Sequence, residues 1–146
     1  MAKSLSVEDG NLDTSTILGS RTREYKDIDL TFTNKKSGEI FKKTHAAAVT
    51  QAVKNLVMTN FNEKPFLPTF GADIRSLLFD LADQDSESDI EDNILSALNV
   101  HEPRAKALNV VATSNPDYNS VDVRITFQVI NTQEEVSLSI VLARLR

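Results

Sequence analysis

The chain has 146 residues, which is enough for one domain with its own core. Its composition, with 40% apolar and 25% charged residues, is ordinary for a globular protein. The lack of cysteine excludes a disulfide framework and a thiolate metal site, and two histidines, His45 and His101, are too few for an imidazole zinc site. The start lacks the apolar core of a signal peptide, and no apolar run approaches the roughly 20 residues of a membrane span. We therefore expect a cytosolic origin, no membrane partner and no metal or cofactor.

The net charge of −5 is unevenly distributed along the chain. The stretch from Ser76 to Pro103 holds eight carboxylates and no Lys or Arg, whereas nine basic residues against five acidic ones lie between Arg21 and Lys64. The simpler explanation of this pattern is that both segments form solvated surfaces. The functional alternative is that neighbouring copies or partners dock on them through opposite charges. Nucleic acid is not an expected partner, because acids dilute the basic half and no aromatic-rich stretch accompanies it.

The N-terminal part contains little that could form a core. Residues 1–22 are mostly Ser, Thr, Asp and Asn with scattered apolar side chains, which predicts an extended arm that is disordered alone or folds on a partner. Residues 23–146 are then expected to form one α+β domain. Its first element is a short strand or an extended segment between Tyr25 and Phe32, where apolar and polar residues partly alternate, followed by a turn at Ser37-Gly38.

Apolar residues at helical spacing predict two helices next. The first opens at Thr44 and cannot continue through Pro65 and Pro68. The second follows Gly71, and its buried stripe consists of Ile74, Leu77, Leu78 and Leu81.

A third helix is predicted after an acidic loop from Asp83 to Glu87. Its start is the capping-box pattern Ser88-Asp89-Ile90-Glu91, in which a hydroxyl satisfies an orphan amide and a carboxylate reaches back. Pro103 ends it, because the residue before a proline is pushed toward extended geometry.

The rest of the chain reads as β-structure. The alternation of Val121, Val123, Ile125, Phe127 and Val129 with polar residues is the cleanest period-2 pattern in the sequence. A strand around Val110 precedes it and another from Val136 to Leu142 follows, with turns at Asn115-Pro116-Asp117 and Asn131 to Glu134. We predict an α+β fold in which about three helices cover one face of a three-stranded antiparallel C-terminal meander.

The sequence offers little catalytic chemistry. It has no nucleophile elbow, dinucleotide fingerprint or P-loop. A glycosidase needs two carboxyl groups about 5–5.5 Å or 6.5–9.5 Å apart, and nothing in the sequence shows that two acids converge. The acids that have apolar neighbours in the sequence, and so would be candidates for such a pair, are Glu63, Asp73, Asp80 and Glu102.

The tripeptide Glu102-Pro103-Arg104 stands where the third helix gives way to the meander. On physical grounds alone it is either a helix stop with two solvated charges or a binding element. In the second case Pro103 stiffens the junction, and Glu102 and Arg104 present an acceptor and a five-donor fork to another chain.

These motifs together resemble a known family, the baseplate wedge or sheath-initiator proteins of contractile-tailed bacteriophages, also called lysozyme-like, with relatives in type VI secretion baseplates. The resemblance spans roughly Asp27 to Leu142 and includes the tripeptide. Its other blocks are Asp27-Ile28-Asp29-Leu30-Thr31-Phe32, Gln51-Ala52-Val53-Lys54-Asn55-Leu56 with Thr59, and the residues Pro68, Phe70, Gly71, Leu77, Leu78, Phe79 and Asp80.

Two departures from the family pattern affect partner contacts. Asn62-Glu63-Lys64 stands where the family usually has Gly-Glu-Arg, and Asp80 where Glu is common. Asn62 can still adopt a left-handed turn, but Lys64 cannot make the planar bidentate contact of Arg.

The resemblance implies a structural protein, not an enzyme, located in the baseplate of the virion tail and assembled in the host cytoplasm. It implies six copies per baseplate, other wedge proteins and the tail sheath as partners, and the tail tube or hub as further neighbours. Glu102, Pro103 and Arg104 would bind the wedge core bundle. The sheath would add to a C-terminal edge strand made of Val136, Ser137, Leu138, Ser139, Ile140, Val141 and Leu142, since an uncovered edge invites pairing.

Two alternatives stay open at this point. One is a peptidoglycan hydrolase of the tail, as the lysozyme-like name suggests, although the sequence has no Trp and few other aromatic residues to stack against sugars. The other is a binding domain outside contractile machines.

Overall fold

A computed structural model describes residues 25–33, 37–78 and 84–143. Strands β1 (Lys26–Ile28) and β2 (Lys42–Thr44) pair antiparallel and lead into helix α2 (His45–Met58). The short helix α3 (Ile74–Leu77) and the long helix α4 (Gln84–His101) follow, and then β3 (Ala105–Asn115), β4 (Ser120–Val129) and β5 (Glu135–Ala143). A 3-10 turn, Pro116–Tyr118, joins β3 to β4. The expected arm 1–22 lies outside the described residues.

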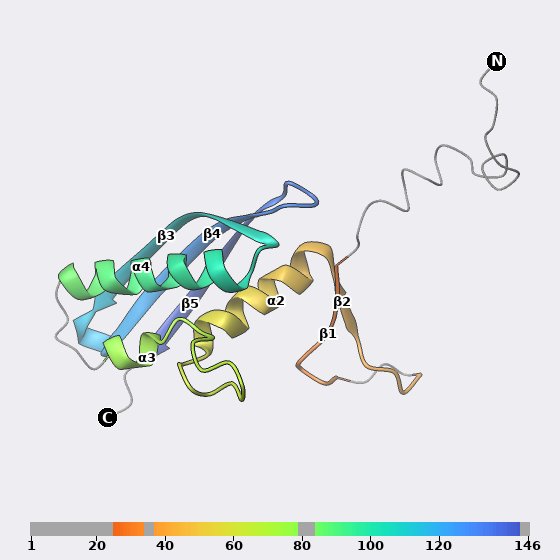
Figure 1. Ribbon diagram of the computed structural model, residues 1–146, viewed down its shortest axis with the longest axis horizontal. Helices are drawn as coiled ribbons and strands as arrows, with labels where there is room; N and C mark the ends of the chain where they lie inside the picture. Colours follow the sequence, from red (N-terminus) through yellow and green to blue (C-terminus); the bar gives the residue numbers. More distant parts are fainter. Residues whose placement is uncertain (1–24, 34–36, 79–83, 144–146) are drawn as a thin grey trace, which may run out of the picture.

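The three C-terminal strands form an antiparallel meander in the order β3-β4-β5, with the helices on one face (Figure 1). Helix α4 packs mainly on β3 and α2 packs on β5, so the helix layer spans the sheet. This confirms the predicted α+β fold. Among the described residues, no helix is long and apolar enough to cross a membrane.

The core lies between that helix layer and the sheet. The alternating residues of β4 and β5 that point toward the helices are buried or half-buried, whereas those between them are mostly exposed, as the period-2 pattern predicts. Helices α2 and α4 contribute the other half of the core. The largest fully buried side chains are Phe127, Leu56, Ile90, Ile94, Leu98 and Ile125.

Helix α4 begins earlier than the sequence indicates, at Gln84. The predicted acidic loop was therefore wrong for residues 84–87, and Ser88 is not an N-cap because it lies one turn inside the helix. The reason is tertiary: Glu91 does not reach back to cap the helix but accepts a hydrogen bond from the amide of Ala112 in β3. A contact between residues so distant in the sequence outweighs the local capping signal.

The N-terminal strand is also shorter than predicted. β1 ends at Ile28, a turn follows at Leu30-Thr31, and Phe32 has a left-handed φ of 51°. The apolar side that the sequence predicts for this strand is not buried, since Ile28, Leu30 and Phe32 are each about half exposed or more. Its partner β2, Lys-Lys-Thr, has no apolar alternation and was not predicted.

Candidate functional site

Glu102, Pro103 and Arg104 form a closed clamp at the junction between α4 and β3. The Nε of Arg104 donates to Glu102 Oε1 at 2.6 Å and its Nη2 donates to Oε2 at 2.8 Å, a bidentate pair across the proline. Glu102 is only 6% exposed, whereas Pro103 is exposed. Glu102 is thus placed to orient Arg104 rather than to meet another chain itself.

Arg104 keeps part of its binding capacity. A guanidinium has five N–H donors, and the clamp uses two, so three remain for another chain. Its side chain is 35% exposed and lies 5.4 Å from the centre of the Tyr25 ring, within cation–π range. The hydrogen bond to Glu102 raises the pKa of Arg104. The side chain is therefore a permanently charged, oriented donor group at the surface.

A structured loop between α2 and α3 carries the second block, Pro68 to Gly71. The amide of Asn62 donates to Pro68 O at 2.8 Å, and the amide of Ala72 donates to Thr59 O at 3.2 Å. Gly71 has a φ of 123°, and a Cβ there would stand 2.2 Å from Thr59 O. Only glycine fits this crossing of two backbone segments.

The same loop is joined to the end of α4 next to the clamp. His101 contacts the carbonyl of Thr69 at 3.1 Å, and its ring lies 5.1 Å from that of Phe70. The Nζ of Lys64 lies 3.8 Å over the Phe70 ring. Leu78 of this block is buried, and Phe79 and Asp80 lie outside the described residues. The loop and the tripeptide thus form one continuous region.

Asn62 and Lys64, the two residues of Asn62-Glu63-Lys64 that depart from the family pattern, have well-defined roles in the loop. Asn62 adopts the left-handed conformation expected of it, with a φ of 66°. Glu63 accepts bonds from the side chain and the backbone of Asn60, which lower its pKa. Lys64 takes up the cation–π contact described above instead of a bidentate pair.

The outer edge of β3 is closed by two carboxylates of α4. Glu87 Oε1 accepts from the amide of Ser114 at 2.6 Å, and Glu91 Oε1 accepts from the amide of Ala112 at 2.8 Å. These are backbone donors that point away from β4 and are typical points of strand addition. The sequence pattern did not predict this role, although the four-residue spacing of the two glutamates places both on one helix face.

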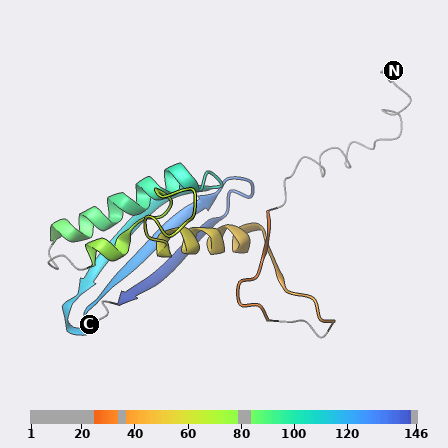
Figure 2. The ribbon, with the colours of Figure 1, turned by 60° about the horizontal axis from the view of Figure 1, so that its bottom comes forward.

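Among the residues that the structure describes, no side chain accepts a hydrogen bond from the outer edge of β5 in this way. Within the described residues, no strand pairs with β5 except β4, and β5 forms the margin of the sheet opposite α4 (Figure 2). Its side chains alternate as predicted: Ile140 and Leu142 are buried and Val136 and Leu138 half-buried, whereas Ser137, Ser139 and Val141 are exposed. The sheet therefore has one closed and one open edge.

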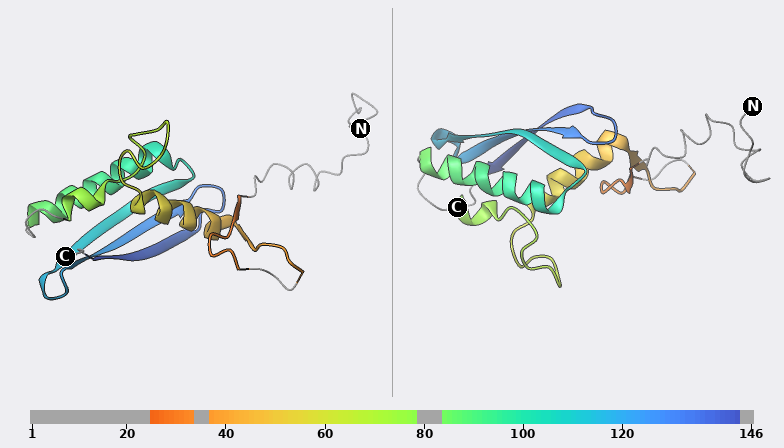
Figure 3. Two further views of the ribbon diagram at one scale, coloured as in Figure 1. Left: turned by 90° about the horizontal axis from the view of Figure 1, so that it is seen from below. Right: turned by 45° about the horizontal axis from the view of Figure 1, so that its top comes forward.

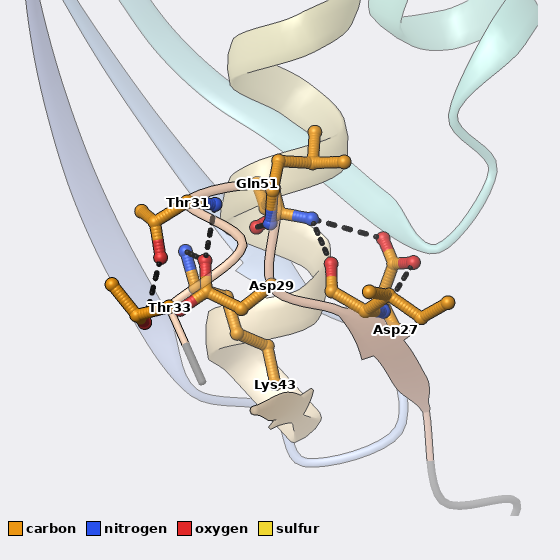
Figure 4. A network of polar contacts seen from close by, with 8 residues as sticks. Asp27, Asp29, Thr31, Thr33, Lys43 and Gln51 are labelled. Carbon is orange, nitrogen blue, oxygen red and sulfur yellow. Dashed lines mark hydrogen bonds and ion pairs between the residues drawn. The ribbon is translucent and has the colours of Figure 1, made fainter. Parts of the chain in front are cut away.

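The N-terminal motif is held on α2 by a buried glutamine (Figure 4). The Nε2 of Gln51 donates to Ile28 O at 2.8 Å, and its Oε1 lies 3.5 Å from the amide of Leu30. Asp29 accepts from the amide of Thr31, which lowers its pKa, and pairs with Lys43 at 3.4 Å. These contacts fix a hairpin that leaves Phe32 and Phe41 exposed.

Each acid considered for catalysis and described here has an intramolecular partner. Glu63 bonds to Asn60, Asp73 accepts from the amide of Phe61 and the hydroxyl of Ser76, and Glu102 is held by Arg104. Asp80 lies outside the described residues. Within the described part of the chain, no three acids or histidines gather as a metal site would require.

Comparison with known proteins matches residues 43–134 to a family model described as baseplate wedge protein gp25. The chain belongs to this family. Its curated relative from Enterobacteria phage T4, baseplate wedge protein gp25, is 26% identical over 112 residues, which cover 77% of this chain and 85% of the relative. The resemblance seen in the sequence is thereby confirmed, and the chain is a baseplate wedge protein of the gp25 type.

Two solved structures share the fold. A putative tail lysozyme from Geobacter sulfurreducens is 21% identical, with a TM-score of 0.60 over 66% of this chain and 89% of that one. A chain of the anti-feeding prophage baseplate is 16% identical, with a TM-score of 0.59 over 84% of this chain and 88% of that one.

Proposed function

We propose that this gp25-type protein binds the wedge core bundle through Pro103 and the oriented Arg104, and templates sheath polymerisation through the outer edge of β5. In this proposal, six copies surround the tail tube or hub. They assemble in the host cytoplasm and remain in the baseplate of the virion tail. The observation that carries it is the asymmetry of the sheet: β3 is closed by Glu87 and Glu91, and β5 is open.

The register identifies the backbone groups that β5 offers. The amide of Val129 donates to Glu134 O. Further along the two strands, Phe127 of β4 pairs with Val136 of β5, and Val123 pairs with Ile140. In an antiparallel pair, the backbone N–H and C=O groups of one residue point toward the partner strand, and those of the next residue point away from it. The N–H and C=O groups that face away from β4 therefore belong to Ser137, Ser139 and Val141.

The core holds this edge in a fixed register. Ile140 and Leu142 are buried under α2, so a slip by one residue would turn these side chains into solvent. An extended segment of the sheath can then form main-chain hydrogen bonds along an edge whose position is already set. Preorganisation of this kind lowers the entropic cost of adding the first sheath subunit.

The wedge-binding part predicts a distinctive result for a pair of variants. Arg104→Ala should lower the free energy of unfolding by about 1–3 kcal/mol, because it leaves the buried Glu102 carboxylate without its partner. The double variant Glu102→Gln/Arg104→Ala should recover part of that loss. Neither variant should co-purify with the wedge proteins, since both lack the donors of Arg104. Chemical denaturation and pull-down measure the two effects separately.

Tyr118→Ala serves as the control, because this exposed residue lies on the β3–β4 turn, away from the clamp. A double variant that melts near the wild type and co-purifies at the wild-type level would show that the clamp serves only the fold of the chain itself.

The alternative of a hydrolase predicts the opposite in a cell-wall assay. We expect no peptidoglycan clearing by the purified protein, because Glu63, Asp73 and Glu102 are each engaged in a structural hydrogen bond. The tests are turbidity of a peptidoglycan suspension and release of soluble fragments, with a known lysozyme as the positive control. Clearing that is lost in Glu63→Gln would overturn the purely structural reading.

A further inference from the structure

The two carboxylates that close β3 are in register with the backbone amides that they bind. Helix α4 runs along β3, at the margin of the sheet opposite β5 (Figure 3). Four residues from Glu87 to Glu91 rise about 6 Å along a helix, and two residues from Ala112 to Ser114 rise about 7 Å along a strand. Because these two repeats match, each glutamate reaches one amide.

The amides of Ala112 and Ser114 are those that an added strand would use. Between them, Thr113 pairs with Asp122 of β4, and the backbone groups of its two neighbours point away from β4. The next residue in this alternation is Pro116, which has no N–H to offer. The two glutamates therefore occupy the outward-pointing amides of β3 from Ala112 onward.

Other side chains already hold the helix on the sheet. Helix α4 is anchored by Ile90, Ile94 and Leu98, which are almost fully buried in the core. Glu87 and Glu91 are only half-buried, at the margin. Two carboxylates bound to edge amides beside a sufficient apolar anchor indicate that their role is to protect this edge.

Without the glutamates, β3 would offer a pairing site to a second copy of the chain. With a twofold axis at Thr113, Ala112 of one copy lies opposite Ser114 of the other, and each such pair exchanges two main-chain hydrogen bonds. These are the same amides that Glu87 and Glu91 bind in the folded chain. A second copy fits this edge because symmetry gives both edges the same spacing.

We propose that Glu87 and Glu91 are specificity residues that prevent β3 from pairing with β3 of a second copy and so restrict strand addition to β5. The part that concerns β5 rests on the proposed function, whereas the block at β3 is independent of it. Neighbouring copies in the proposed baseplate raise the local concentration of such edges. A chain with two open edges would therefore link to its neighbours in competition with the sheath.

The test is a disulfide cross-link between two copies of the full chain. The chain has no cysteine, so Thr113→Cys places a single thiol on the exposed face of β3. In the symmetric pairing, the Cα atoms of residue 113 in the two copies lie about 4.5 Å apart, close enough for a disulfide. This variant is oxidised mildly, alone and combined with Glu87→Ala/Glu91→Ala, which keeps α4 helical.

The alanine background should give at least about tenfold more cross-linked dimer than Thr113→Cys alone, because it frees both amides. Hydrogen exchange at Ala112 and Ser114 should also become faster, since their acceptors are gone. The single variant Glu91→Ala frees one amide and should give a smaller increase in dimer. It serves as the test if the double variant melts early.

Two pairs of control variants separate the hydrogen bond from the charge. Glu87→Gln/Glu91→Gln keeps a side-chain oxygen as acceptor at both positions, so the yield of dimer should stay within about twofold of Thr113→Cys alone. Asp89→Ala/Asp92→Ala removes two exposed carboxylates of the same helix and should also leave the yield unchanged.

Two outcomes would overturn the inference. Equal cross-linking with and without the alanines would show that the glutamates do not block β3. An equal increase in Asp89→Ala/Asp92→Ala would show that the charge of α4 keeps the copies apart, not the bonds to β3. The role of β5 is judged separately, because sheathed tails from Ser139→Pro would contradict the template at β5 and leave the block at β3 in place.

Discussion

Replacing Ser139 with proline is expected to give tails without sheath from a protein that still folds. The amide of Ser139 points away from β4, so its loss removes a donor that only an added strand would use. The proline ring also occupies the space in which an incoming backbone would lie. Edge strands tolerate proline at such positions, since no ladder bond of the sheet itself is broken. Electron microscopy of assembled particles should show bare tubes on complete baseplates.

The matched control for this prediction is Ser139→Ala, which keeps the amide and changes only an exposed side chain. It should support normal sheath. Leu138→Pro is the opposite control: its amide faces β4, opposite Ile125, and its loss should unfold the sheet. Normally sheathed tails from a stably folded Ser139→Pro protein would show that the outer edge of β5 is not the template.

Replacing Gly71 with alanine is expected to destabilise the protein by about 2–5 kcal/mol. The new Cβ would lie 2.2 Å from Thr59 O and 2.9 Å from Thr59 C, both backbone atoms that cannot rotate away. The φ of 123° adds strain that glycine does not have. Against a typical total stability of about 5–15 kcal/mol, this is a large fraction.

Gly38→Ala separates the two causes. Gly38 also has a positive φ, 82°, but nothing lies within 4 Å of an added Cβ, so only the backbone strain of about 1–2 kcal/mol applies. Thermal and urea unfolding of both variants should show a clearly larger loss at Gly71. Equal losses would mean that the loop moves away from Thr59 at little cost.

The β-meander shows how strongly a local pattern can determine structure. The alternation from Val121 to Val129 predicts both the strand and the face that it buries, because one register puts every apolar side chain into the core. Helix α2 follows in the same way from its apolar spacing and from the prolines that prevent its continuation. In these elements, local preference and tertiary packing favour the same conformation.

Glu102 shows where such reasoning fails. A charged pair around a proline at the end of a helix looks solvated in the sequence, because acids are mostly exposed. The fold buries Glu102 at the junction between α4 and β3, and the bidentate bond to Arg104 makes that burial possible. Which member of the tripeptide remains available to a partner could be learned only from this geometry.

The sequence by itself determined the fold class and the family, because period-2 and helical patterns and ordered motifs are local properties. Only the tertiary structure decided where α4 begins, which acids are used internally and which edge of the sheet is closed. The physical reason is distance along the chain: Glu91 meets Ala112 and Glu87 meets Ser114, 21 and 27 residues away. Contacts of this kind exist only after the helix has packed on the sheet, so no local pattern encodes them.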